Sequence, residues 1–170
     1  MKTPFCKFDL KTGVPCPKCQ SLIDNGVYTK LDFEISRILY ELEDNFSFLK
    51  DAEYFKSIKE EDTLFIVIKV KRETPYFLIK RLERKVSKKL KTNLYVKIVL
   101  WRGEDIKSLI ENLIRPARLT TITTVWFPDG SLQYNVRLTR REIRRLPFPR
   151  IMLEKVLSKI LGHGVEIVFS

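Results

Sequence analysis

Three cysteines lie within the first nineteen residues, and they are the side chains best suited to chemistry. Their spacing is Cys6-x9-Cys16-x2-Cys19. Two thiolates separated by two residues in a tight turn can point at one Zn²⁺ ion, and prolines on either side of Cys16 pre-set such a turn. The neighbouring Lys18 favours the thiolate form. We therefore expect Cys6, Cys16 and Cys19 to hold a structural zinc ion.

Structural zinc takes four ligands, and three cysteines leave one position open. Asp9, Asp24, the distant His163 or a second copy of the chain would supply the fourth. Two other interpretations stay open: reduced thiols in a small loop, and a disulfide of Cys6 in an oxidising compartment or a thermophile. A redox-active CxxC pair is disfavoured, because no βαβ pattern surrounds it.

The net charge indicates an anionic partner. The chain of 170 residues has 32 Lys and Arg against 21 Asp and Glu, a formal charge of +11. Residues 1–70 carry 10 basic and 12 acidic side chains, whereas residues 71–170 carry 22 and 9. An anion would therefore meet the second part of the chain.

Few residues are suited to catalysis. His163 is the only histidine, and it lies between two glycines near the C-terminus. The chain has no P-loop, GxGxxG or HExxH motif, and it lacks the clustered carboxylates and histidines of a metal-dependent nuclease. We expect a protein that is not an enzyme and has no small-molecule substrate.

The sequence does not predict a membrane protein. No apolar run reaches the roughly 18 residues that a spanning helix needs. Residues 1–9 lack the apolar stretch of a signal peptide. We expect a cytoplasmic protein with no membrane partner.

After the cysteines, the hydrophobic pattern gives one order of elements twice. Thr29 with Asp32 begins a helix with an apolar stripe, and the apolar run 63–70 predicts a central strand. In the second copy, Phe127–Gly130 predicts a hairpin turn. The first copy is expected as a helix over 29–42, strands over 52–58 and 63–70, a helix over 74–90 capped by Thr74, and a strand over 93–100. The second is expected as a helix over 104–115, strands over 119–127 and 132–138, a short helix over 139–145, a helix over 150–161 with Ile151 inside, and a strand over 165–169.

This order predicts an α+β fold built from two units of type α-β-β-α-α-β, each with helices on one face of a three-stranded sheet. The expected parts are a cysteine knuckle over 1–28, a first domain over 29–101 and a second over 102–170. A single α+β domain whose halves match by chance is the alternative.

The order resembles that of prokaryotic-type KH domains, and the tandem pair resembles the archaeal NusA-like proteins of transcription elongation and termination. Three stretches carry the likeness. They are Arg102–Ile106 continuing through Leu113–Arg118, the hairpin Val125–Gly130, and the head formed by Cys6, Lys11-Thr12-Gly13 and Cys16–Cys19. The resemblance implies RNA binding and a role in elongation or termination.

The units depart from the KH pattern at the loop that grips nucleic acid. KH domains use a GxxG loop between two helices, whose main-chain N–H groups meet phosphates. Here the corresponding stretches are Arg72–Pro75 and Leu146–Arg150, and neither has a glycine. Both units are therefore degenerate KH-like domains, in which side chains would have to bind the RNA.

Two basic segments supply such side chains. Arg81, Arg84, Lys85 and Lys88 fall on one face of the expected helix 74–90, at spacings that allow them to meet a line of phosphates. The second segment contains only arginines as its basic residues, and arginine binds phosphate bidentately and stacks on bases. We expect RNA contacts from Arg81, Arg84, Lys85, Lys88, Arg137, Arg140, Arg141, Arg144, Arg145, Phe148 and Arg150.

These features predict a protein that binds single-stranded RNA through the basic second half of the chain. The alternative is a non-catalytic interaction module that docks on RNA polymerase or a ribosomal subunit and has lost RNA binding together with the glycines.

Overall fold

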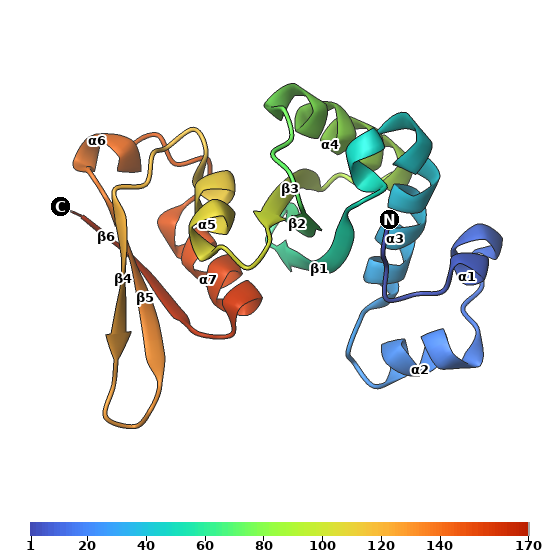
Figure 1. Cartoon of the computed structure of the whole chain (residues 1–170), viewed down its shortest axis with the longest axis horizontal. Coiled ribbons are helices and arrows are strands. Elements are labelled where there is room, and N and C mark those ends of the chain that lie inside the picture. The colour runs from blue at the N-terminus through green and yellow to red at the C-terminus, as the bar shows by residue number, and fades with distance from the viewer. Residues whose placement is uncertain (170) are drawn as a thin grey trace. The chain divides into compact units, whose positions relative to one another are not determined.

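The computed structural model describes residues 1–169, and the chain has an α+β fold. It divides into two compact units, Met1–Gly103 and the residues from Glu104 on. Each unit contains one three-stranded sheet with helices beside it (Figure 1). The cysteine-containing head belongs to the first unit.

The first unit consists of a small helical head and a sheet covered on one face by two helices. In chain order its elements are α1 (Lys7–Thr12), α2 (Pro17–Asp24), α3 (Lys30–Leu42), the 3-10 turns η1 (Glu43–Asn45) and η2 (Ser47–Leu49), β1 (Glu53–Glu60), β2 (Thr63–Val70), α4 (Tyr76–Leu90) and β3 (Tyr95–Arg102). The strand order is β1-β2-β3, with β1 antiparallel and β3 parallel to β2.

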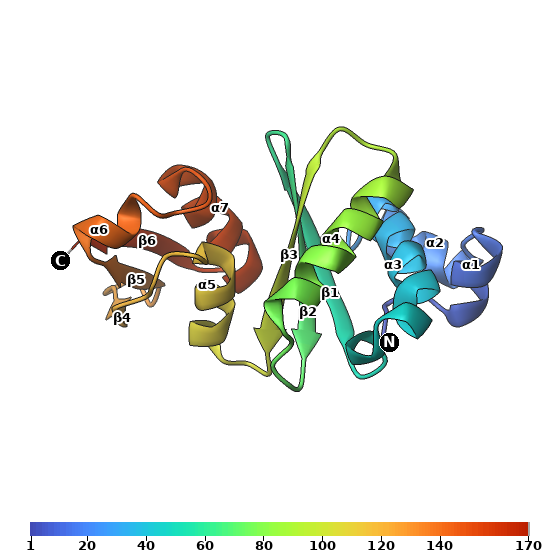
Figure 2. The same cartoon turned by 90° about the horizontal axis from the view of Figure 1, so that it is seen from above.

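The core of this unit lies between the sheet and helices α3 and α4 (Figure 2). Alternate residues of β2 and β3 face the two helices, because side chains along a strand alternate between its faces. Ile66 and Ile98 meet Leu39 of α3 and Leu82 of α4 there, each at most 2% exposed. This burial fixes the orientation of α4, and with it the direction in which the basic side chains of that helix point.

Local signals explain where α3 begins. The side chain of Thr29 accepts a hydrogen bond from the Asp32 backbone N–H, and the Asp32 carboxylate accepts one from the Thr29 N–H at 2.7 Å. This capping box is the one expected from the sequence. Asp32 also accepts hydrogen bonds from the Tyr54 and Ser57 hydroxyls on β1, so the cap ties α3 to the sheet.

The second unit has a similar order of sheet and helices, with two helices instead of one between its second and third strands. Its elements are α5 (Ile106–Ile114), β4 (Thr121–Trp126), β5 (Leu132–Leu138), α6 (Arg140–Ile143), α7 (Arg150–Leu161) and β6 (Gly164–Phe169). The strand order is β4-β5-β6, with β4 antiparallel and β6 parallel to β5. The hairpin of β4 and β5 extends beyond helices α5 and α7 (Figure 1). Its turn has Gly130 at φ 83°, as a tight turn at that position requires.

Four expectations at the level of elements are wrong. Only one helix, α4, joins β2 to β3, as the expected helix over 74–90 does, so the general type α-β-β-α-α-β does not apply to the first unit. The N-cap of α4 is Pro75, not Thr74, and no side chain caps it. Ile151 is 67% exposed, because Met152 and Leu153 face the core of the second unit instead. The head contains two short helices that were not expected.

Within residues 1–169, no helix combines the length and the apolar character that crossing a membrane requires.

Candidate metal centre and nucleic-acid interface

Two short helices position the three cysteines. Cys6 is the N-cap of α1, Cys16 is the N-cap of α2, and Cys19 lies in the first turn of α2. Pro17 at the first position of α2 suits a helix start, because its fixed φ is helical and no N–H is needed there. The chain thus brings two helix N-termini, and the thiols on them, to one place.

Gly13 allows the chain to return from α1 to Cys16. It ends α1 in the left-handed region at φ 77°, and its N–H donates to the Asp9 carbonyl at 2.7 Å. A Cβ at this position would lie 2.7 Å from Nη1 of Arg37 on α3. Both the backbone angle and the close approach of Arg37 therefore favour glycine.

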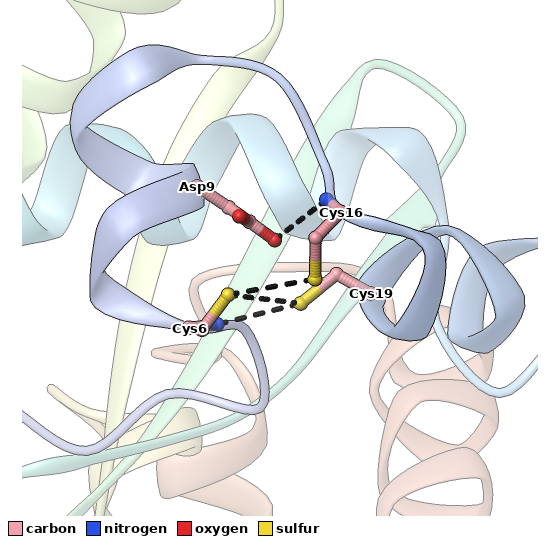
Figure 3. Close-up of side chains that lie close together, drawn as sticks. All are labelled: Cys6, Asp9, Cys16 and Cys19. Atoms are coloured by element: carbon pink, nitrogen blue, oxygen red, sulfur yellow. Dashed lines mark hydrogen bonds between the residues drawn. The ribbon is translucent and has the colours of Figure 1, made fainter.

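The three sulfur atoms and one carboxylate lie close together (Figure 3). The Sγ of Cys6 is 3.7 Å from that of Cys16 and 3.6 Å from that of Cys19. Asp9 faces them and accepts a hydrogen bond from the Cys16 N–H at 2.8 Å. The ligand atoms of Cys6, Asp9, Cys16 and Cys19 all lie within 4.8 Å of one another. Four such groups could hold a metal ion.

The sulfur spacing fits tetrahedral coordination. With metal–sulfur bonds of about 2.3 Å, two sulfurs of a tetrahedral zinc site are about 3.8 Å apart. The Cys6–Cys16 and Cys6–Cys19 sulfur separations are close to this value. All three cysteines are free thiols, so the structure does not contain the disulfide considered above.

Asp9 is the oxygen donor in this group, and Asp24 is not. Asp24 lies outside the group and accepts a hydrogen bond from the Gln20 side chain at 2.8 Å. His163 belongs to the second unit and contacts the Tyr134 ring. Of the fourth ligands considered from the sequence, the geometry supports Asp9.

The charges in the group depend on hydrogen bonds and burial. Burial, and after it the hydrogen bond with Asp9, raise the pKa of the Cys19 thiol to about 12. A hydrogen bond with Asp9 also raises the pKa of Cys6. The Cys16 backbone N–H holds the pKa of Asp9 well below its usual range. In the metal-free group the carboxylate is charged and these two thiols keep their protons, which a metal ion would displace.

A small apolar cluster attaches the head to α3. Phe5, Leu10 and Cys19 pack with Phe33 of α3. The rings of Phe5 and Phe33 meet edge to face, with centroids 5.1 Å apart. Order in the head is therefore coupled to the core of the first unit.

The basic residues of α4 have different surroundings. Lys85 lies over the Phe46 ring, 5.7 Å from its centroid, and Lys89 pairs with Glu41 of α3 at 2.6 Å. Arg84 and Lys88 line a cavity on another side of the helix, together with Lys80. Of the expected set Arg81, Arg84, Lys85 and Lys88, two residues line the cavity and Lys85 contacts a ring; Lys80, which was outside that set, lines the cavity as well.

The arginine segment of the second unit has few acidic partners. Arg145 pairs with Glu142 at 3.2 Å, and Arg150 pairs with Glu154 at 2.9 Å. The other four arginines are exposed, and none of them forms an ion pair within residues 1–169. They are Arg137 on β5, Arg140 and Arg141 on α6, and Arg144 at the end of α6.

The loop between α6 and α7 has fewer main-chain donors than a GxxG loop. Pro147 and Pro149 have no N–H, and the Leu146 N–H donates to the Ile143 carbonyl at 3.2 Å. Phe148, expected to stack on a base, is half-buried. An anion that binds at this loop would be held mainly by side chains such as that of Arg144.

The positive charge is shared between the units. Residues 1–103 carry 21 basic and 14 acidic side chains, and residues 104–170 carry 11 and 7. The first unit is therefore at +7 and the second at +4, because the basic helix α4 belongs to the first unit.

Comparison with known proteins identifies a structure with a similar fold but does not identify a family. No family model matches the chain, and no curated protein matches it. Among solved structures, the crystal structure of APE1850 is similar, with a TM-score of 0.51 and 15% sequence identity. The match covers 79% of this chain and 96% of that chain. At this identity the likeness shows the fold alone.

Proposed function

We propose that this chain is a non-catalytic RNA-binding protein built from two degenerate KH-like units. The observation that carries the proposal is the group of Arg137, Arg140, Arg141 and Arg144, which are exposed and lack acidic partners among the described residues. Because no carboxylate neutralises these four side chains, their charge is available to an anionic partner. By the resemblance described above, the protein would act in transcription elongation or termination, and we propose that it does so in the cytoplasm.

The chemistry of this group suits phosphate. The guanidinium group is planar, always charged and able to donate two parallel hydrogen bonds to one phosphate. No glycine-rich loop adds main-chain donors, so recognition would rest on side-chain contacts to the backbone of a single strand. Such contacts carry little sequence information, and we propose weak sequence preference.

We further propose that the head binds a structural Zn²⁺ ion through Cys6, Cys16, Cys19 and Asp9. The donor set supports this, because three thiolates and one carboxylate match the ligand types and number of a closed zinc site. The bound ion would neutralise the thiolates and hold α1 and α2 together against α3.

Charge-neutral variants test the RNA-binding proposal. In the triple variant Arg140→Gln/Arg141→Gln/Arg144→Gln, we expect the affinity for a labelled single-stranded RNA at low salt to fall about tenfold or more. The reason is that three phosphate contacts are lost. Fluorescence anisotropy measures the affinity.

The matched control is Lys50→Gln/Lys56→Gln/Lys59→Gln. It removes the same charge from exposed positions of the first unit that lie outside both basic segments. Equal losses in the two triple variants would show a general charge effect and would contradict the assignment to the arginine segment.

One observation favours the alternative function, a docking module for polymerase or ribosome. Trp126 and Phe127 at the end of the β4–β5 hairpin are 69% and 42% exposed. Exposed aromatic residues are enriched at protein interfaces. A module of this kind would lose partner binding in Trp126→Ala and would show no RNA affinity at low salt.

A further inference from the structure

A surface cavity of about 690 Å³ lies in the first unit, beside the C-terminal half of α4. Its other wall is the connection from α4 to β3 and the start of β3, which contribute Thr92, Asn93 and Tyr95. The helix ends at Lys91 in the left-handed conformation, φ 50°, and the chain turns there toward β3. The volume is in the range of cavities that bind small ligands.

On the helix side, the cavity is lined by a row of three basic side chains. Lys80, Arg84 and Lys88 are four residues apart, so their side chains lie above one another on one face of α4. The packing of Leu82 and Val86 against the sheet sets this orientation. Three positive groups thus point to one space.

One acidic residue lines the cavity, and its carboxylate is already paired with groups of the protein. Glu83 is 5% exposed, and its carboxylate accepts hydrogen bonds from the Ile98 N–H at 3.0 Å and from Lys80 Nζ at 2.8 Å. Arg84 and Lys88 have no ion pair within the described chain. The cavity therefore keeps about two positive charges without a counter-charge.

The opposite wall adds polar groups and an aromatic ring. Thr92 and Asn93 offer a hydroxyl and an amide, both of which are able to donate hydrogen bonds to oxygen atoms. Tyr95 is 52% exposed. An exposed ring beside two unpaired cations fits a ligand that combines an anionic group with a planar ring.

We propose that this cavity binds the phosphate group of a nucleotide. Arg84 and Lys88 contact the phosphate, and the base stacks on Tyr95. The ligand is either a free nucleotide or one nucleotide of an RNA chain, and the two sources share this chemistry. For the class of ligand the inference rests on the proposed function, but the site is separate from the arginines of the second unit.

Titration of the whole ¹⁵N-labelled protein with AMP, followed by NMR, tests the proposal. We expect saturable shifts at the backbone amides of Thr92, Asn93 and Tyr95. Adenosine, which lacks the phosphate, should bind with an affinity at least about tenfold lower than that of AMP. The dinucleoside monophosphate ApA, whose only phosphate is a diester, distinguishes the sources: binding comparable to AMP indicates an RNA chain, and much weaker binding indicates a free nucleotide or a terminal phosphate.

Two pairs of variants assign the contacts. Arg84→Gln/Lys88→Gln should weaken AMP binding at least about tenfold, whereas Lys56→Gln/Lys59→Gln on β1 should leave it unchanged. Tyr95→Ala should weaken it severalfold, whereas Tyr95→Phe should not, because the ring is kept.

No saturable shift at residues 92–95 would overturn the cavity proposal, as would AMP binding unaffected by Arg84→Gln/Lys88→Gln. Neither result would bear on RNA binding by the arginine segment, which is read from Arg140, Arg141 and Arg144 variants. If those variants lose RNA binding but keep AMP binding, the cavity and the arginine segment are independent sites.

Discussion

At the scale of single residues, Asp9 has two roles that need to be separated. Its carboxylate accepts the Cys16 N–H and also faces three sulfur atoms. Asp9→Asn keeps an acceptor oxygen for that N–H but removes the negative charge. If Asp9 is the fourth ligand, we expect zinc affinity to fall about 10- to 100-fold, measured by competition with a chromophoric chelator.

The control for this variant is Asp24→Asn, which removes an equal charge from outside the group and should leave the affinity unchanged. Asp9→Cys supplies a fourth thiolate and should retain tight binding. Wild-type affinity in Asp9→Asn would mean that the carboxylate is not a ligand.

Asp32 is a second residue with a defined electrostatic role. Burial raises the pKa of its carboxyl, but hydrogen bonds from Ser57, Tyr54 and Thr29 outweigh burial, and the pKa is lowered overall. The folded state thus prefers the charged carboxylate more than the unfolded state does. Its contribution to stability is present above the usual Asp pKa and is lost as the pH falls through the folded-state pKa.

Asp32→Asn should therefore reduce the free energy of unfolding by roughly 2 kcal/mol at neutral pH, since buried donors lose a charged acceptor. Urea denaturation at several pH values should show this difference shrinking in acid. Glu34→Gln, on the exposed side of the same helix, is the control and should have almost no effect. A difference independent of pH would contradict the assigned charge.

At the scale of elements, the proposed metal ion would stabilise the head. α1 and α2 have 6 and 8 residues, too short to be stable in isolation. Zinc at a thousand times its dissociation constant would stabilise the folded head by about 4 kcal/mol. Chelation should lower the melting temperature of the first unit by roughly 15 °C.

NMR locates the effect of chelation within the chain. Amides of residues 6–24 should lose their dispersed signals, whereas those of β4, β5 and β6 should keep theirs. An unchanged melting temperature after chelation would contradict a structural metal in the head.

The elements that the sequence predicted well are those with a strong hydrophobic period. The apolar run of β2 and the capping box of α3 are read locally, and the structure has both. The two helices of the head have no such period, because their stability comes from packing on Phe33 and from the cysteine group. Between Val70 and α4 the structure has no further helix, and the sequence predicted none there.

The same limit applies to the site residues. The cysteine spacing predicted the three thiols, and it named Asp9 only as one of two acids, because choosing between them requires the return of the chain at Gly13. Helical spacing grouped Arg81, Arg84, Lys85 and Lys88 on one face. It could not show that Phe46 and Glu41 occupy one side of α4, or that Lys80 faces the same cavity as Arg84.

At the scale of the whole molecule, the high net positive charge is the feature most relevant to function. The chain keeps a formal charge of +11 while its buried acids serve internal hydrogen bonds, as Glu83 and Asp32 do. Exposed cations without partners repel one another, and an anionic polymer would relieve this repulsion on binding. Both units contribute such cations.

The most direct test of the central proposal is the affinity for labelled single-stranded RNA, measured by anisotropy across a salt series. For single strands, the slope of log K against log salt is about −0.7 for each phosphate neutralised. We predict a slope of about −3, corresponding to roughly four contacts, and a shallower slope in Arg140→Gln/Arg141→Gln/Arg144→Gln. The absence of binding at low salt, or a slope near zero, would contradict RNA binding by this chain.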